Sequence, residues 1–278
     1  MKLFKSLFIA ALSLLASVTA LADIERIEIT SRNTLSDSNV DFSYESISGV
    51  AYFTLDPNED LNGAVTDIAY APVNGDGLVE YAADFRLLVP SVSVANGGLL
   101  YNVNSRGGSS FPPEQSLLHP LSGMGFTYLA TGWINELSPR DGRLRLHAPI
   151  VGSAEQRITG QVRYEVSVGS TAEKLNIAGN GHLAYEPTAA GLANASLTRR
   201  LYQDDPRLPV ERSQFQLEVV VENDSNQPIV NLSVAGGFQP GMLYELVYEA
   251  RNPVLAGAGM AAIRDMVSAI RFGDDTTD

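Results

Sequence analysis

Short apolar or alternating runs of strand length recur along the chain, separated by Gly, Pro, Asn and Asp residues that favour turns. They predict strands at residues 23–31, 44–55, 78–90, 99–103, 126–131, 144–147, 161–168, 215–221, 229–234 and 243–248. Residues 33–39 are polar and predict a loop, and residues 169–213 show no readable period. The pattern therefore indicates a β-rich first part.

A helical period appears only near the end of the sequence. There, apolar residues recur every three or four positions, at Met260, Ile263, Met266, Val267 and Ile270, which is typical of one buried helix face. Weaker patterns predict short helices at residues 113–121 and 190–197.

The last strand and this helix are joined by a break in the pattern. Pro253 ends the strand at residues 243–248, because proline lacks an N–H and restrains the residue before it. Gly257 and Gly259 then allow a tight turn into the helix. We expect a strand feeding a helix that packs back on the same sheet, which is half of a βαβ unit and indicates an α/β second part.

The first 22 residues have the order of a secretory signal peptide. Lys2 and Lys5 give a positive start, residues 7–18 are apolar, and Ala20 and Ala22 fit a signal-peptidase site. A membrane anchor is the alternative reading, but the apolar run is short for a spanning helix. We therefore expect residues 1–22 to be removed and a mature domain at residues 23–278 to be periplasmic or extracellular.

The amino-acid composition argues against several classes of binding partner and site. The chain has 32 Asp and Glu against 19 Lys and Arg, a formal net charge of −13, which argues against nucleic acid and against a basic membrane-binding patch. It has no Cys, so disulfides and thiolate metal sites are excluded. We expect no cofactor, because the segment around Gly257 and Gly259 lacks the remaining glycine and the lysine of a phosphate loop.

Motifs for catalysis are missing. No serine lies between correctly spaced glycines, as the strand-to-helix elbow of serine hydrolases requires. Ser122 follows Pro120 and Leu121, and Ser110 precedes a phenylalanine and two prolines. A pair of catalytic carboxylates stays open, because such pairs meet in space and not in sequence.

The three histidines do not indicate a metal site. His119, His147 and His182 are far apart and belong to no metal-binding motif. His119 precedes a proline, His182 lies in a glycine-rich turn, and His147 falls in a predicted strand, where a structural role is the better interpretation.

One segment indicates a ligand site. The apolar strand at residues 99–103 runs into Asn104, Ser105, Arg106, Gly107 and Gly108. A glycine loop at the carboxyl end of a parallel strand exposes backbone N–H groups where α/β sheets bind ligands and where hydrolases place an oxyanion donor. A plain glycine turn is the alternative. Trp133, the only Trp, follows another strand end, where it lines a pocket or fills the core.

Four blocks of the chain, in this order, resemble the secreted bacterial family of α/β-hydrolase-domain proteins: APVNGDGLVEYAADFRLLVP, LLYNVNSRGG, TYLATGWINEL and GMLYELVYEARNPVLAGAGMAAIRDMVSAI. The resemblance covers residues 24–271 and implies an α/β fold, a partial α/β-hydrolase-type sheet with a β-rich N-terminal elaboration. In that family the helix leads to a strand and a serine elbow, and the acid and the histidine follow later. The resemblance therefore implies that this chain is the N-terminal portion and lacks the nucleophile, so no catalytic residue is transferred.

By this resemblance, a few residues of the chain correspond to walls of the active site in that family. Asn104, Arg106 and Gly107 correspond to the oxyanion side of the site, Trp133 to a second wall, and Glu136 to an acidic residue expected near it. It implies an exported carboxylic-ester hydrolase acting on a small or polymeric ester, inactive without its missing segments. The alternative is a secreted β-rich binding or structural module without an active site. The sequence leaves the substrate and the oligomeric state open.

Overall fold

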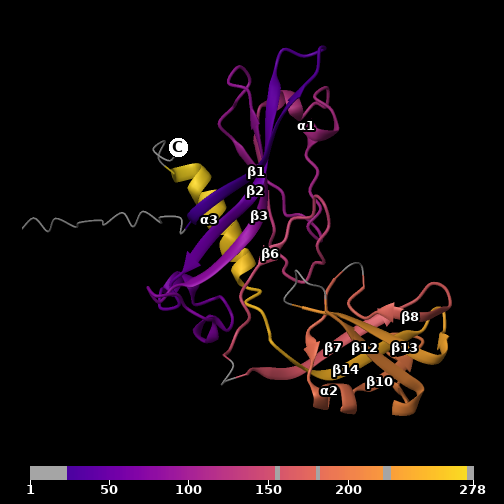
Figure 1. Cartoon of the computed structure of the whole chain (residues 1–278). Coiled ribbons are helices and arrows are strands. Elements are labelled where there is room, and N and C mark those ends of the chain that lie inside the picture. The colour runs from indigo at the N-terminus through magenta and orange to yellow at the C-terminus, as the bar shows by residue number, and fades with distance from the viewer. Residues whose placement is uncertain (1–23, 154–156, 180–181, 222–226, 274–278) are drawn as a thin grey trace, which may run out of the picture.

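The computed structural model describes residues 24–153, 157–179, 182–221 and 227–273 (Figure 1). Strands make up 44% of it and helices 15%. The strands are β1 (Ile24–Ser36), β2 (Ser43–Leu55), β3 (Val79–Pro90), β4 (Leu99–Tyr101), β5 (Thr127–Thr131), β6 (Leu146–His147), β7 (Thr159–Ser167), β8 (Ala172–Asn176), β9 (Glu186–Pro187), β10 (Ser196–Arg200), β11 (Leu208–Val210), β12 (Phe215–Val220), β13 (Ile229–Phe238) and β14 (Leu243–Arg251). The α-helices are α1 (Pro112–Gln115), α2 (Ala189–Asn194) and α3 (Ala258–Phe272), and the helical fraction also includes the 3₁₀ helices η1 (Asp60–Asn62), η2 (Ile68–Tyr70), η3 (Ser122–Met124) and η4 (Arg212–Gln214).

The described chain forms two lobes, visible in Figure 1. The first lobe, residues 24–153 and 253–273, contains one sheet in the order β1-β2-β3-β5-β4, with β6 paired to β3. All its pairs are antiparallel except β4 with β5, which run parallel. This parallel pair places the carboxyl ends of β4 and β5 side by side.

The core of the first lobe lies between its sheet and α3. On β2, alternate positions such as Ile47, Ala51 and Phe53 are buried, as the period of two in a strand requires. Phe53 stacks on Tyr81 of β3 with ring centroids 4.9 Å apart. Ala258 and Ala262 of α3 complete this core and are fully buried.

The second lobe, residues 157–252, has two antiparallel sheets around a core of its own. One has the order β11-β10-β14-β7, with β9 paired to β14, and the other the order β12-β13-β8. Tyr164 of β7 and Tyr248 of β14 stack with centroids 5.9 Å apart, and Phe238 meets Tyr244 edge to face at 4.9 Å. Aromatic pairs thus hold the packing within this lobe.

The predicted α/β fold class is wrong. The described residues form three mainly antiparallel sheets with three helices, which is not the helix–sheet arrangement of an α/β-hydrolase. The physical reason lies in β14, whose two edges are filled by antiparallel neighbours β7 and β10. After Pro253 the chain leaves that sheet, and α3 packs against β1, β3 and β5 of the first lobe.

The predicted buried face of α3 is also shifted. Met260 is 63% exposed and Ile270 is 38% exposed, whereas Ala258, Ala261, Ala262, Asp265 and Met266 are buried. Small residues on the buried face let the helix approach the sheet closely. An added Cβ at Gly259 would lie 2.2 Å from the Trp133 backbone oxygen, so the bulkier apolar residues lie at the edges of the face.

Other predicted elements differ in extent. β1 continues to Ser36, where a polar loop is predicted, because its partner β2 supplies backbone hydrogen bonds along its whole length. The helix predicted at residues 113–121 is only the four-residue α1, and the helix predicted at 190–197 ends at Asn194, where β10 follows. The unreadable segment at 169–213 contains β8 to β11 and α2.

The predicted signal peptide at residues 1–22 lies outside the described residues. Within the described ranges, no helix combines the length and the apolar character needed to span a bilayer.

Candidate functional site

The parallel ends of β4 and β5 position the candidate site. Asn102 N–H donates to the Leu129 carbonyl at 2.8 Å, which continues the pairing one residue beyond β4. The hydroxyls of Tyr101 and Thr131 lie 2.6 Å apart. Burial raises the pKa of Tyr101, so this pair is neutral at ordinary pH and holds the two strand ends together.

Asn104 fastens the loop after β4 to the end of β5. It is 2% exposed. Its Nδ2 donates to the Thr131 carbonyl at 2.7 Å, and the Trp133 Nε1 donates to the Asn104 carbonyl at 2.9 Å. The Asn104 Oδ1 is buried and has no hydrogen-bond partner among the described residues. A buried acceptor without a partner is costly and marks a place where a donor fits.

The loop continues as a tight turn at residues 105–108. Gly108 N–H donates to the Ser105 carbonyl at 3.1 Å, and the central residues Arg106 and Gly107 have φ of 51° and 73°, as in a type I′ turn. Neither central N–H donates a hydrogen bond to a described residue. The turn therefore presents two adjacent backbone donors.

Gly107 is fixed by its surroundings. An added Cβ would lie 2.4 Å from the Leu144 carbonyl oxygen and 2.9 Å from the Leu137 side chain. Leu144 N–H also donates to the Gly107 carbonyl at 2.8 Å. Both the positive φ and the contact with Leu144 thus require glycine here.

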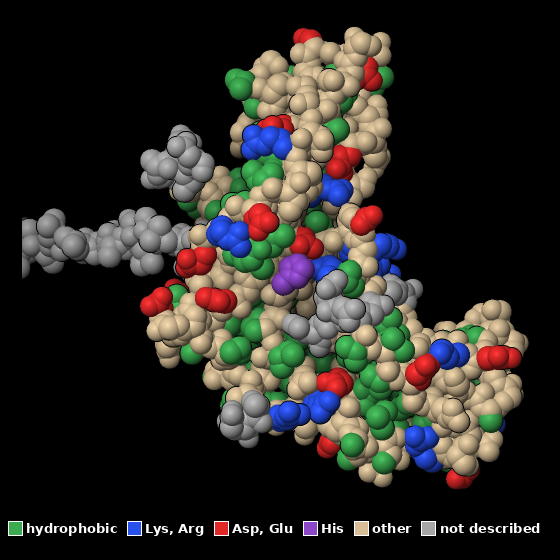
Figure 2. Space-filling model, viewed as in Figure 1, with side chains coloured by type: hydrophobic (Ala, Val, Ile, Leu, Met, Phe, Trp, Pro, Cys, Tyr) green, Lys and Arg blue, Asp and Glu red, His purple; other side chains and the backbone are tan. Residues whose placement is uncertain are grey.

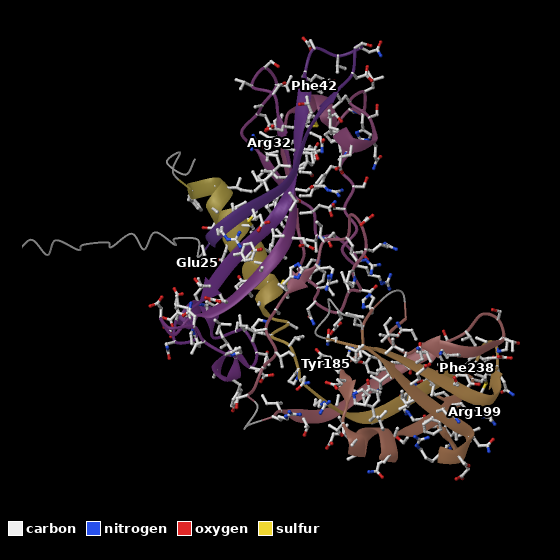
Figure 3. All side chains as sticks on the ribbon, viewed as in Figure 1. Glu25, Arg32, Phe42, Tyr185, Arg199 and Phe238 are labelled. Atoms are coloured by element: carbon white, nitrogen blue, oxygen red, sulfur yellow. The ribbon has the colours of Figure 1, made fainter. Side chains whose placement is uncertain are left out.

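Glu136, in the segment that follows β5, connects the first lobe to the second lobe through two hydrogen bonds. The Leu183 N–H donates to its carbonyl at 2.6 Å, and the Tyr185 hydroxyl donates to its Oε1 at 3.3 Å. Tyr185 lies on the side of the second lobe nearest the first (Figure 3). Burial raises the pKa of Tyr185, and the negative charge of Glu136 raises it further. The tyrosine therefore keeps its proton and donates to the carboxylate.

His182 lies near the side chains of Glu136, Arg106 and Arg143. Its pKa is lowered by burial and by the guanidinium groups of Arg106 and Arg143, while Glu136 acts in the opposite direction. Its Nε2 is buried without a hydrogen-bond partner among the described residues. The ring is therefore neutral near pH 7.

The structure brings the sequence-predicted residues into one region, which we call the strand-end cluster: Asn104, Arg106, Gly107, Trp133 and Glu136. Asn104 bonds to Trp133, Gly107 packs near Leu137, and Arg106 and Glu136 both act on His182. Sequence reasoning missed Tyr185 and the position of His182, because both lie within residues 169–213, where the pattern has no readable period. In the sequence, only the presence of a histidine and a tyrosine within residues 182–185 could have indicated that this segment contributes to a site.

Other candidate side chains have structural roles. The Ser122 hydroxyl donates to the Ser116 carbonyl at 2.9 Å, and Ser110 accepts from Gln115 at 3.0 Å. The His119 Nδ1 accepts from the Leu121 N–H. These contacts cap and close the loop around α1, and none of them activates a hydroxyl.

His147 forms the one histidine–carboxylate contact in the described ranges. Its Nε2 lies 2.8 Å from Asp84 Oδ1, and Asp84 Oδ2 accepts the Arg145 N–H at 2.8 Å. No serine or threonine hydroxyl of the described chain bonds to a histidine ring. The same residues contain no group of three metal-binding side chains. The described chain therefore holds no assembled nucleophile–base pair.

No protein-family description, curated protein or solved structure matches the chain. The resemblance to the hydrolase family stays a hypothesis.

Proposed function

We propose that this chain supplies the oxyanion-side wall of a carboxylic-ester hydrolase exported from the cell. One observation carries the proposal: the turn at residues 105–108, held at the end of the parallel β4–β5 pair, presents two N–H groups that bond to no described residue. Ester cleavage passes through a tetrahedral species whose oxygen becomes negative, and preorganised backbone donors stabilise that charge.

Four residues of the strand-end cluster have distinct parts in this proposal. Asn104 holds the turn against β5 through Thr131, and Gly107 permits its backbone conformation. The half-buried Trp133 offers an apolar surface beside the donors, and its Nε1 is already engaged with Asn104. Glu136 fixes Tyr185 and acts on His182. The cluster binds and orients an ester.

The proposal assigns no bond-breaking step to these residues. Attack on the ester carbonyl needs a nucleophile and a base that removes its proton, and the described residues contain no hydroxyl–histidine pair. We therefore expect the chain alone to stay unlabelled by a serine-directed fluorophosphonate and not to turn over p-nitrophenyl esters. A labelled serine in this chain would refute that part of the proposal.

Trp133 reports ligand binding, because it is the only Trp in the chain. We expect the monoanion of ethyl methylphosphonate, whose tetrahedral phosphorus resembles the intermediate, to change the fluorescence of the mature chain saturably. Neutral ethyl acetate should bind more weakly, since its carbonyl carries less charge. The Trp133→Phe variant is the control for signal from the ligand itself. No saturable change with the phosphonate would contradict the proposal.

A second function is a non-catalytic, exported β-rich binding or structural module. The observation in its favour is the described chain itself, which is 44% strand and holds no nucleophile–base pair. The fluorescence titration separates the two, because a structural module has no reason to prefer a tetrahedral anion over a neutral ester.

A further inference from the structure

A cavity of about 330 Å³ lies where the two lobes are connected. Two segments cross there: residues 149–152 leave the first lobe, and residues 251–255 return to it. Val151 N–H donates to the Pro253 carbonyl at 2.7 Å, and Leu255 N–H donates to the Pro149 carbonyl at 3.0 Å. The cavity walls include Val151, Gly152, Ser153, Arg157, Arg251 and Asn252. Figure 2 shows the surface of the molecule from the same side as Figure 1, with charged side chains on both lobes.

Two arginines line this cavity, and one carboxylate, Glu186, lies beside them. Arg251 forms an ion pair with Glu186, and the Asn252 Nδ2 donates to the other oxygen of that carboxylate at 2.8 Å. The hydrogen bond from Arg251 lowers the pKa of Glu186, and the charge of Arg157 lowers it further. Among the described residues, one carboxylate thus lies near two guanidinium groups.

Donor capacity remains on both arginines. The Arg251 Nε is buried and has no hydrogen-bond partner among the described residues. Arg157 forms no ion pair with a described carboxylate. A buried N–H of a charged group without an acceptor is costly. An oxyanion in the cavity would place a charged acceptor beside Arg157 and Arg251, which both line it.

The backbone at the cavity adopts unusual conformations. Asn252 has a φ of 58° and Gly152 a φ of 96°. Among the described residues only two other non-glycine residues have a positive φ, Asp67 and Arg106. Strained residues concentrate at binding sites, where the surrounding structure holds them. At Asn252 this conformation accompanies the side-chain contact with Glu186.

We propose that this cavity binds a small oxyanion, a carboxylate or phosphate group, between the side chains of Arg157 and Arg251, which both line it. Guanidinium groups bind both anions through paired N–H donors. The volume lies at the lower end for ligand pockets, which favours an inorganic anion or a short-chain acid. The site shares no residue with the strand-end cluster, so this inference goes beyond the proposed function.

Because the chain is acidic overall, an anion can bind only through local positive groups. At −13 the whole chain repels anions at long range. Binding must therefore depend on the two local arginines and not on a general positive field. Exposed arginines elsewhere should not contribute.

Isothermal titration of the mature chain tests this, with sodium phosphate and sodium butyrate as separate ligands at constant ionic strength set by chloride. We expect saturable binding of at least one, weakened roughly tenfold in Arg157→Gln, which removes one charged donor. The matched control is Arg163→Gln on β7, which pairs with Glu245 outside the cavity and has a side chain 63% exposed. It should leave the affinity unchanged.

Arg251→Gln provides a second variant, with its folding checked by circular dichroism, because it also removes the ion pair with Glu186. Phosphate binding alone assigns the site to phosphate groups, and butyrate binding alone assigns it to carboxylates. The proposal is overturned if neither ligand binds saturably below about 50 mM, or if affinity survives both arginine substitutions. Trp133 fluorescence with phosphonate should be unaffected by Arg157→Gln, which separates this test from that of the proposed function.

Discussion

Gly107 illustrates how single residues define the candidate site. Its φ of 73° and the Leu144 carbonyl beside it exclude a side chain, and Asn104 holds the preceding backbone through Thr131. These constraints fix the direction of the two N–H groups in the turn. The neighbouring Gly108 lacks both constraints, since an added Cβ would meet only the Ser105 oxygen at 3.6 Å.

Replacing Gly107 by alanine should therefore destabilise the fold by about 1–3 kcal/mol, because alanine is strained at positive φ and clashes with Leu144. Urea unfolding of the mature chain measures this free energy. Gly108→Ala is the matched control and should change it by less than about 0.5 kcal/mol. Equal effects of both substitutions would show that the turn is not held as described.

The sequence indicated part of this site for a physical reason. Asn104 and Trp133 each follow an apolar strand, and parallel neighbouring strands end at the same edge, so their proximity could be expected. Tyr185 and His182 could not be placed, since they reach Glu136 from another lobe through contacts distant in sequence.

At the scale of elements, α3 shows what hydrophobic periodicity can and cannot give. The period correctly predicted a helix, which spans Ala258–Phe272. The buried face is centred on small residues, because the helix lies close to Trp133 and the sheet. Alanines carry little weight in an apolar pattern, so the larger Met260 and Ile270 shifted the predicted face.

Two methionines of α3 test the observed face. Met266 is 2% exposed and Met260 is 63% exposed. Met266→Ala should cost about 2–5 kcal/mol of unfolding free energy, because it leaves a cavity in the core. Met260→Ala should cost less than about 0.5 kcal/mol. Chemical unfolding of the two variants compares them directly, and similarly large costs for both would support the face predicted from the sequence, which contains both methionines.

The predicted βαβ unit failed for a different reason. Sequence adjacency of a strand and a helix does not state which sheet the helix covers. β14 is enclosed by β7 and β10 in one lobe, while α3 packs on the other. The Asn252 conformation and Pro253 redirect the chain between them.

At the scale of the whole molecule, the second lobe is inserted into the first. Its two ends are neighbours, because Thr159 of β7 pairs with Arg251 of β14. It also has a core of its own, which includes Leu197, Leu232, Tyr244 and Leu246. The amino-acid composition does not change at these boundaries, so the sequence predicts a single domain at residues 23–278.

The insertion predicts that residues 157–252 fold as an isolated fragment. Its core is internal and its ends are already paired, so excision removes few stabilising contacts. A dispersed amide spectrum and a cooperative thermal transition of the fragment are the expected results. A fragment that is unfolded at room temperature would show that the second lobe depends on the first for its stability.

The central claim is that the turn at residues 105–108 binds the oxygen of a tetrahedral ester intermediate. Amide-resolved NMR titration of the mature chain with the ethyl methylphosphonate monoanion tests it most directly. We expect the N–H signals of Arg106 and Gly107 to shift most, followed by the Trp133 indole signal. Gly97, in a loop, and Gly236, in β13, also have positive φ and should not respond. Unchanged Arg106 and Gly107 signals at saturating phosphonate would contradict the claim.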